Sequence, residues 1–189
     1  MKFFSLFSPV GLSNAYLVGP DAGGDAVLVD PGTFDSALLQ AVEGSRLYVR
    51  SILVTHAHNA HINGIRALLK VYDARIYSNQ PSVLDFPARH IAEGEELAMQ
   101  EFTVRVRETP GHSIDSVCFL IGGMLFTGDT LSAGGIGRTR DGYARGVLLA
   151  SIRRKLLPLD DSMLVFPGHG PPSTIGAERR FNPYLGEKL

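Results

Sequence analysis

Segments with the hydrophobic pattern of β-strands and segments with the hydrophobic pattern of α-helices alternate along the 189-residue chain. This alternation limits the possible folds of the chain more than any other sequence feature. The first quarter holds short strand-like runs, FFSLF, AYLV and AVLVD, separated by turns rich in glycine, proline and aspartate. The period then changes, and residues 33–44 read as an amphipathic helix with Thr33 or Asp35 as candidate cap and Gly44 as its end. Strands alternating with helices indicate an α/β or α+β class.

The same two periods return further along the chain. Strand patterns are RLYVRSILV (46–54), EFTVRVR (101–107), VCFLIGGMLFTGD (117–129, two strands around a Gly122-Gly123 turn) and MLVF (163–166). Helical patterns cover residues 62–72, 143–157 and 174–181. Strands dominate, and the number of strands predicts two sheets to bury.

Length, charge and composition limit the domain organisation and the kinds of partner that we expect for this chain. A length of 189 residues predicts one domain, 1–189. A net charge of −1 argues against a nucleic-acid partner, and the absence of a run of ~20 apolar residues argues against a membrane span. Serines and Pro9 interrupt the apolar start MKFFSLFSPVG, which favours a first strand and a cytoplasmic protein. The single cysteine, Cys118, reads as a small apolar core residue. The oligomeric state stays open.

The histidines are distributed in a way that points to chemistry. Five of the six sit beside turn residues at the end of an apparent strand, and Asp129 in FTGDT occupies the same kind of position. The five are His56, His58 and His61 in THAHNAHING, His112 in TPGHS and His169 in PGHG. Side chains on strand-end loops along one rim can converge, and neutral imidazole with carboxylate oxygen suits zinc, iron or manganese. The pattern predicts a metal site.

In their order along the chain, these motifs resemble the metallo-β-lactamase superfamily, whose first motif is THxHxDH followed by a lone histidine, a lone aspartate and a last histidine. The ending PGHGPPSTIGAERRFNPYL is similar to single-domain glyoxalase II-like hydrolases of that superfamily. The resemblance runs from the first strand to about Leu185. It implies a four-layer αββα sandwich with the site on one edge.

The resemblance also implies ligands for two metals. It assigns His56, His58 and His112 to the first metal, Asp129 as a bridge, and His61 and His169 to the second; Asp129 and His169 are also its catalytic residues. The aspartate of THxHxDH is replaced by Ala60, and Asn59 is one position too early to substitute for it. We therefore expect one firmly bound zinc and a second that is weaker, with iron or manganese as alternatives.

Three functions follow from the resemblance. The leading one is a metal-dependent hydrolase in which a metal-bound hydroxide attacks a small thioester or ester. The second is a degenerate member that binds metal or ligand without catalysis, since Ala60 can neither ligate nor orient the hydroxide. The third resembles an iron-dependent persulfide dioxygenase, for which His56, His112 and Asp129 could hold the iron.

Other polar residues have weaker claims. Asp30 in LVDPG is equally well explained as a residue that orients a metal ligand and as a turn former before Pro31. Arg138 in GGIGRTRDG reads as a solvated loop arginine, and His90 as a surface residue. Tyr143 and Tyr184 could line a substrate pocket or simply pack.

Overall fold

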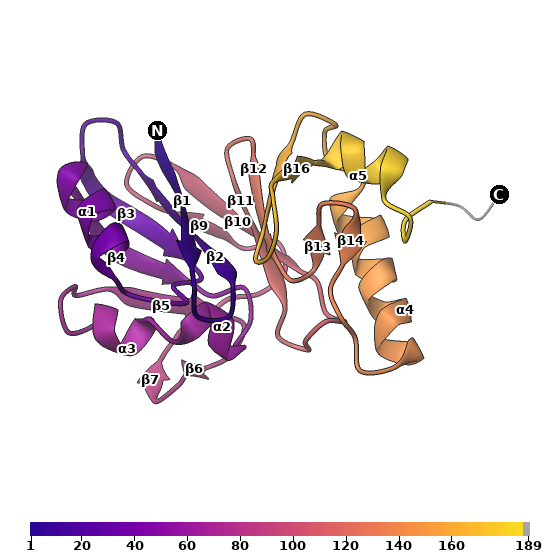
Figure 1. Ribbon diagram of the computed structural model, residues 1–189, viewed down its shortest axis with the longest axis horizontal. Helices are drawn as coiled ribbons and strands as arrows, with labels where there is room; N and C mark the ends of the chain where they lie inside the picture. The colour runs from indigo at the N-terminus through magenta and orange to yellow at the C-terminus, as the bar shows by residue number, and fades with distance from the viewer. Residues whose placement is uncertain (187–189) are drawn as a thin grey trace. The chain divides into compact units, whose positions relative to one another are not determined.

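The computed structural model describes residues 1–186, which form two compact units, residues 1–91 and residues 92 onward (Figure 1). Each unit is built around one six-stranded sheet. The prediction of a mixed class with two main sheets is thus confirmed, and each unit supplies one sheet with its helices. None of the helices within residues 1–186 is long and apolar enough to cross a membrane.

The first unit has the strand order β1-β2-β3-β4-β5-β8. The first three strands are antiparallel neighbours, whereas β3, β4, β5 and β8 run parallel to one another. Its elements are β1 (Lys2–Ser8), β2 (Ser13–Gly19), β3 (Gly24–Val29), α1 (Ser36–Gly44), β4 (Leu47–Leu53), α2 (Asn59–Ile62), α3 (Ile65–Leu68), β5 (Arg75–Ser78), the hairpin β6 (Ser82–Val83) and β7 (Phe86–Pro87), and β8 (Arg89–His90).

Helices of the first unit pack on one face of this sheet. Leu38 and Val42 of α1 and Ile65 of α3 share a buried cluster with strand residues such as Leu28 and Ile52. Of the two candidate caps for α1, Asp35 is the one used, because its side chain accepts a hydrogen bond from the Leu38 N–H. The predicted first strand is also confirmed.

The prediction of one helix over residues 62–72 is wrong, because the chain forms two single turns instead, α2 and α3. The break lies at Gly64, whose N–H donates to the carbonyl of Pro31 at 2.8 Å rather than to its own helix. A Cβ at position 64 would lie 2.5 Å from the carbonyl carbon of Thr33, so only glycine allows this approach. Hydrophobic periodicity does not record such a contact.

The second unit has the strand order β16-β15-β12-β11-β10-β9. The strands β9 to β12 are antiparallel, β12 and β15 are parallel, and β16 is antiparallel to β15. Its elements are β9 (Glu96–Ala98), β10 (Thr103–Glu108), β11 (Val117–Ile121), β12 (Met124–Gly128), the hairpin β13 (Leu131–Ser132) and β14 (Gly135–Ile136), α4 (Gly142–Ser151), a π-helical turn (Ile152–Leu156), β15 (Leu164–Pro167), β16 (Ser173–Thr174) and α5 (Ile175–Phe181).

The core of the second unit joins α4 and α5 to its sheet. Leu148 of α4 and Ile175 of α5 cluster with Cys118 of β11, Leu125 of β12 and Val165 of β15. Cys118 is fully buried, as predicted. The two strands predicted around Gly122-Gly123 are present, with Ile121 paired to Met124.

The buried strand β12 ends next to Asp129, and its core side chain offers a stability test. Leu125→Ala should lower the free energy of unfolding by about 2–5 kcal/mol, because Leu125 is fully buried and its truncation leaves a cavity. Leu164→Ala makes the same change at a side chain that is 44% exposed and should cost roughly 0.5 kcal/mol. Urea unfolding of both variants measures the difference, and equal losses would contradict the assignment of Leu125 to the core.

Candidate metal centre

In the first unit, parallel strands deliver the polar residues to one edge. The strands β3 and β4 are parallel neighbours, so their carboxyl ends lie at the same edge of the sheet. Asp30 directly follows β3, and Thr55 and His56 follow β4. A ligand atom from each of Asp30, His56 and His61 lies within 4.8 Å of the others, and all three residues are buried.

Asp30 holds an unusual backbone conformation. Its φ of 49° is in the left-handed region, which costs most non-glycine residues of the order of 1–3 kcal/mol and which aspartate and asparagine tolerate best. Its side chain accepts two hydrogen bonds from Thr55, from the backbone N–H at 2.8 Å and from the hydroxyl at 2.6 Å. These bonds tie the end of β3 to the end of β4.

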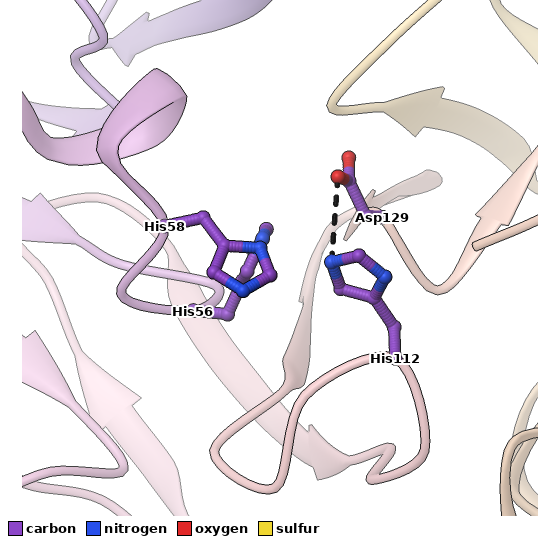
Figure 2. Close-up of side chains that lie close together, drawn as sticks. All are labelled: His56, His58, His112 and Asp129. Atoms are coloured by element: carbon purple, nitrogen blue, oxygen red, sulfur yellow. Dashed lines mark ion pairs between the residues drawn. The ribbon is translucent and has the colours of Figure 1, made fainter. Parts of the chain in front are cut away.

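His56 and His61 of the first unit lie close to this carboxylate. The Thr55 hydroxyl lies 3.1 Å from Nδ1 of His56, and Nδ1 of His61 lies 3.0 Å from Oδ2 of Asp30. The ring of His56 lies close to those of His58 and His61, with centroids 4.5 and 4.4 Å apart. Figure 2 shows the His56 and His58 rings next to each other. His58 is exposed, unlike the other two histidines.

The charge of Asp30 also acts on a neighbouring strand. Burial raises the pKa of the Tyr16 hydroxyl, a hydrogen bond to Asn14 opposes the rise, and the carboxylate of Asp30 adds to it. Tyr16 is therefore a neutral phenol at physiological pH.

In the second unit, three strand ends likewise share an edge. Since β10 and β12 are each antiparallel to β11, they run in the same direction, and β15 is parallel to β12. His112, Asp129 and His169 come after the carboxyl ends of β10, β12 and β15 respectively. The topology of this sheet thus places them at one edge.

Asp129 lies between two histidines. Its Oδ1 is 2.7 Å from Nδ1 of His169, and its Oδ2 is 3.5 Å from Nε2 of His112, the pair joined by the dashed line in Figure 2. The other ring nitrogen of His112, Nδ1, is 2.7 Å from the carbonyl oxygen of Arg138. A carbonyl can only accept, so Nδ1 carries the proton and Nε2 carries the lone pair of the neutral ring.

This pair has the dimensions that a divalent cation requires. Two bonds of about 2.0–2.1 Å at a tetrahedral angle place their donor atoms roughly 3.4 Å apart, close to the 3.5 Å between Nε2 of His112 and Oδ2 of Asp129. A backbone carbonyl on the second nitrogen of a ligating imidazole is one of the common orienting contacts in metal sites. The donor types and the spacing fit a metal ion.

Other backbone segments pack closely around Ala60, the position at which the family motif has an aspartate. Ala60 lies in α2, and its carbonyl oxygen accepts a 2.6 Å hydrogen bond from the Ser13 hydroxyl. A Cβ built on Gly11 would lie 2.6 Å from the Cβ of Ala60, and one on Gly32 would lie 2.1 Å from its carbonyl oxygen. The backbone of this segment is therefore held by the β1–β2 loop and by the turn after β3.

The remaining candidates are placed as follows. The side chain of Arg138 is exposed, as predicted, and His90 lies exposed in β8. Tyr143 is 83% exposed. The guanidinium carbon of Arg145 lies over the ring of Tyr184, 5.5 Å from the centroid of that ring. Sequence reasoning missed Thr55 and the carbonyl of Arg138, and for the carbonyl no residue type could have signalled its role.

Comparison with known proteins shows the family to which the chain belongs. The family model described as the metallo-beta-lactamase superfamily matches residues 8–169. The hydroxyacylglutathione hydrolase GloC of Haemophilus influenzae is 34% identical over 190 residues, covering 87% of this chain and 89% of that protein.

Two solved structures share the fold. The BLEG-1 B3 metallo-beta-lactamase is similar with a TM-score of 0.86 and 33% identity, over 98% of this chain and 100% of that one. TTHA1623 in a di-iron-bound form has a TM-score of 0.82 and 33% identity, over 96% of this chain and 100% of that one. The predicted fold class is confirmed, and the chain belongs to the metallo-beta-lactamase superfamily.

Proposed function

We propose that the protein is a metal-dependent hydrolase of small thioesters or esters. The observation that supports this most directly is Asp129, whose two carboxylate oxygens face one histidine each, while the carbonyl of Arg138 fixes the tautomer of His112. The resemblance to a hydroxyacylglutathione hydrolase supports a thioester as the substrate class. Hydrolase chemistry in general follows from the superfamily.

The ligands proposed for each cation are those that the sequence motifs assign. His56, His58, His112 and Asp129 would hold the first cation, and His61, His169 and the shared Asp129 would hold the second. A bound divalent cation would polarise the acyl carbonyl and acidify water. The residues of the chain would orient that chemistry, because Arg138 fixes the His112 ring and His169 fixes one oxygen of Asp129.

Zinc is the metal that we propose, with iron or manganese as alternatives. The donors are imidazole nitrogen and carboxylate oxygen, which all three metals accept. Because the similar protein TTHA1623 has a di-iron-bound form, we retain iron as an alternative metal for this chain. A single domain, 1–189, and a small-molecule substrate complete the proposal.

Metal content tests the centre directly. Protein purified without added metal should retain about one tightly held metal per chain and lose a second on dialysis, because Ala60 leaves the second set without its own carboxylate. Elemental analysis before and after dialysis measures both. Zinc with thioester turnover supports the hydrolase, whereas one equivalent of iron without hydrolysis favours the dioxygenase-like alternative. If two ions are bound equally tightly, the alanine at position 60 does not weaken the affinity of the second metal site.

The glycine beside the Asp129–His112 pair gives a geometric test. Gly137→Ala should weaken metal binding, because the new Cβ would lie 1.9 Å from the Asp129 carbonyl oxygen and 3.0 Å from the Cβ of His112. Gly142→Ala is the matched control, since a Cβ there has no heavy atom of the described chain within 4 Å. Zinc titration should show a loss of about tenfold or more for Gly137→Ala alone. Equal affinities would contradict the placement of this pair in the centre.

Restoring the motif carboxylate tests the second metal. Ala60→Asp should strengthen the weaker site and raise turnover, because an ionised oxygen adds a ligand and compensates the charge of the cation. Ala57→Asp adds the same charge to an exposed position of the same motif and should do neither. The measurements are metal titration, thioester turnover and thermal unfolding with and without metal. If Ala60→Asp folds but matches Ala57→Asp in all three, the vacancy is not a simple lost ligand.

A further inference from the structure

We propose that Glu178 of α5 is a positioning residue for the metal centre, because it holds the β13–β14 hairpin in place. Asp129 precedes this hairpin and Arg138 follows it, so the hairpin sets how both residues approach His112. The inference rests on the metal centre proposed above and goes beyond it, since Glu178 belongs to neither of the proposed ligand sets.

Glu178 is a buried carboxylate, 3% exposed, that accepts hydrogen bonds from three segments of the second unit. The N–H of Gly134, at the turn of the hairpin, lies 3.0 Å from Oε2 and 3.2 Å from Oε1. The hydroxyl of Ser173 in β16 donates to Oε1, and the amide of Asn182 donates to Oε2 at 2.7 Å. These donors are uncharged, and the two oxygens of an ionised carboxylate can accept from all of them.

The place of Glu178 in its helix does not account for these contacts. It lies in the first turn of α5, where the helix dipole favours a negative charge. That effect does not require burial, and burying a carboxylate costs free energy unless hydrogen bonds compensate. The helix already has a cap, because the Thr174 hydroxyl accepts from the Ala177 N–H. The bond from Gly134 instead joins α5 to a segment 44 residues earlier in the chain.

The β13–β14 hairpin depends on such an anchor. Each of its strands has only two residues, and an isolated two-stranded hairpin is at best marginally stable in water. Residues of α5 and its end hold both sides of the turn, since Gly134 donates to Glu178 and the carbonyl of Gly135 accepts from Asn182 at 3.0 Å. The amide group of Asn182 thus donates both to the hairpin and to Glu178. Figure 1 shows the hairpin between α5 and α4.

The base of the hairpin carries the groups that face His112. The N–H of Gly137 donates to the carbonyl of Thr130 at 3.4 Å, and a Cβ on Gly137 would lie 1.9 Å from the carbonyl oxygen of Asp129. The segments that enter and leave the hairpin therefore lie side by side. The next residue, Arg138, supplies the carbonyl that lies 2.7 Å from Nδ1 of His112. A displaced hairpin would move this carbonyl away from the imidazole.

Two substitutions of Glu178 test the proposal. Glu178→Met keeps the length of the side chain and removes both acceptor oxygens. Since Gly134 is exposed, its N–H can bind water instead, and we expect a folded chain with a looser hairpin. Glu178→Gln is the conservative rescue, because its amide oxygen can replace Oε2 and accept from Gly134 and Asn182. Its NH₂ group can donate to the Ser173 hydroxyl, which is able to accept.

Arg179→Met is the matched control at the next position of α5. The guanidinium of Arg179 donates to the carbonyls of Leu157 and Leu159 and contacts Asp161, not the hairpin. Arg179→Met therefore loosens α5 without removing a bond to β13 or β14. Urea unfolding of each variant measures the change in stability, so that a general loss of stability can be separated from a displaced hairpin.

The main readouts are the tautomer of His112 in chelated protein and the zinc affinity. Nitrogen-15 NMR above the ordinary histidine pKa of about 6.5 distinguishes protonated from lone-pair ring nitrogens. The wild-type chain should carry the proton on Nδ1, whereas Glu178→Met should show a mixture of both tautomers and a loss of zinc affinity of about tenfold. Glu178→Gln and Arg179→Met should keep the wild-type tautomer and an affinity close to that of the wild type.

Two results would overturn the proposal. One is a folded Glu178→Met chain with the wild-type His112 tautomer and zinc affinity. The other is an Arg179→Met chain with the same losses as Glu178→Met, which would show only a general effect of loosening α5. If Glu178→Met does not fold, Asn182→Ala takes its place, because it removes the bond to the Gly135 carbonyl, and an unchanged His112 tautomer there would also count against the proposal.

Failure of the proposed function is a separate outcome. A wild-type chain without zinc affinity, whose His112 tautomer is fixed and is lost in Glu178→Met, would refute the metal centre and leave the positioning role of Glu178 in place.

Discussion

Parallel pairing between strands that are joined by a crossover connection is the constraint on which both units depend. The pairs β3–β4 and β12–β15 each require a crossover through helical segments, and each brings two strand ends to one edge. Aspartate follows the first strand of each pair, Asp30 in one unit and Asp129 in the other, and histidine follows near the end of the second. In each unit a buried sheet therefore fixes the backbone positions that carry these polar side chains.

In each unit one carboxylate lies close to two histidines. Asp30 contacts His61 directly and reaches His56 through Thr55, while Asp129 lies between His112 and His169. Imidazole can bind a cation only through a nitrogen that carries a lone pair, so the placement of its other proton matters as much as the placement of the ring. The backbone carbonyl of Arg138 performs this task for His112.

Much of the fold could be predicted from the sequence because buried strands and amphipathic helices carry their period in residue type. The cap at Asp35, the paired strands around Gly122-Gly123 and the core position of Cys118 are examples. The two-residue strands β6 to β8 are too short to show a period. The candidate ligands could be named from motif spacing, whereas their orientation depends on a hydroxyl proton and a backbone carbonyl that no residue pattern records.

The break at Gly64 makes the segment that carries His61 a case of local frustration. The apolar spacing of residues 62–72 favours a continuous helix, yet the hydrogen bond from Gly64 to Pro31 enforces two separate turns. Helix-stabilising substitutions at Asn63 or Gly64, which a stability-design protocol would choose first, would strengthen the competing conformation. Engineering of this protein for thermal stability would therefore have to leave this stretch a poor helix former.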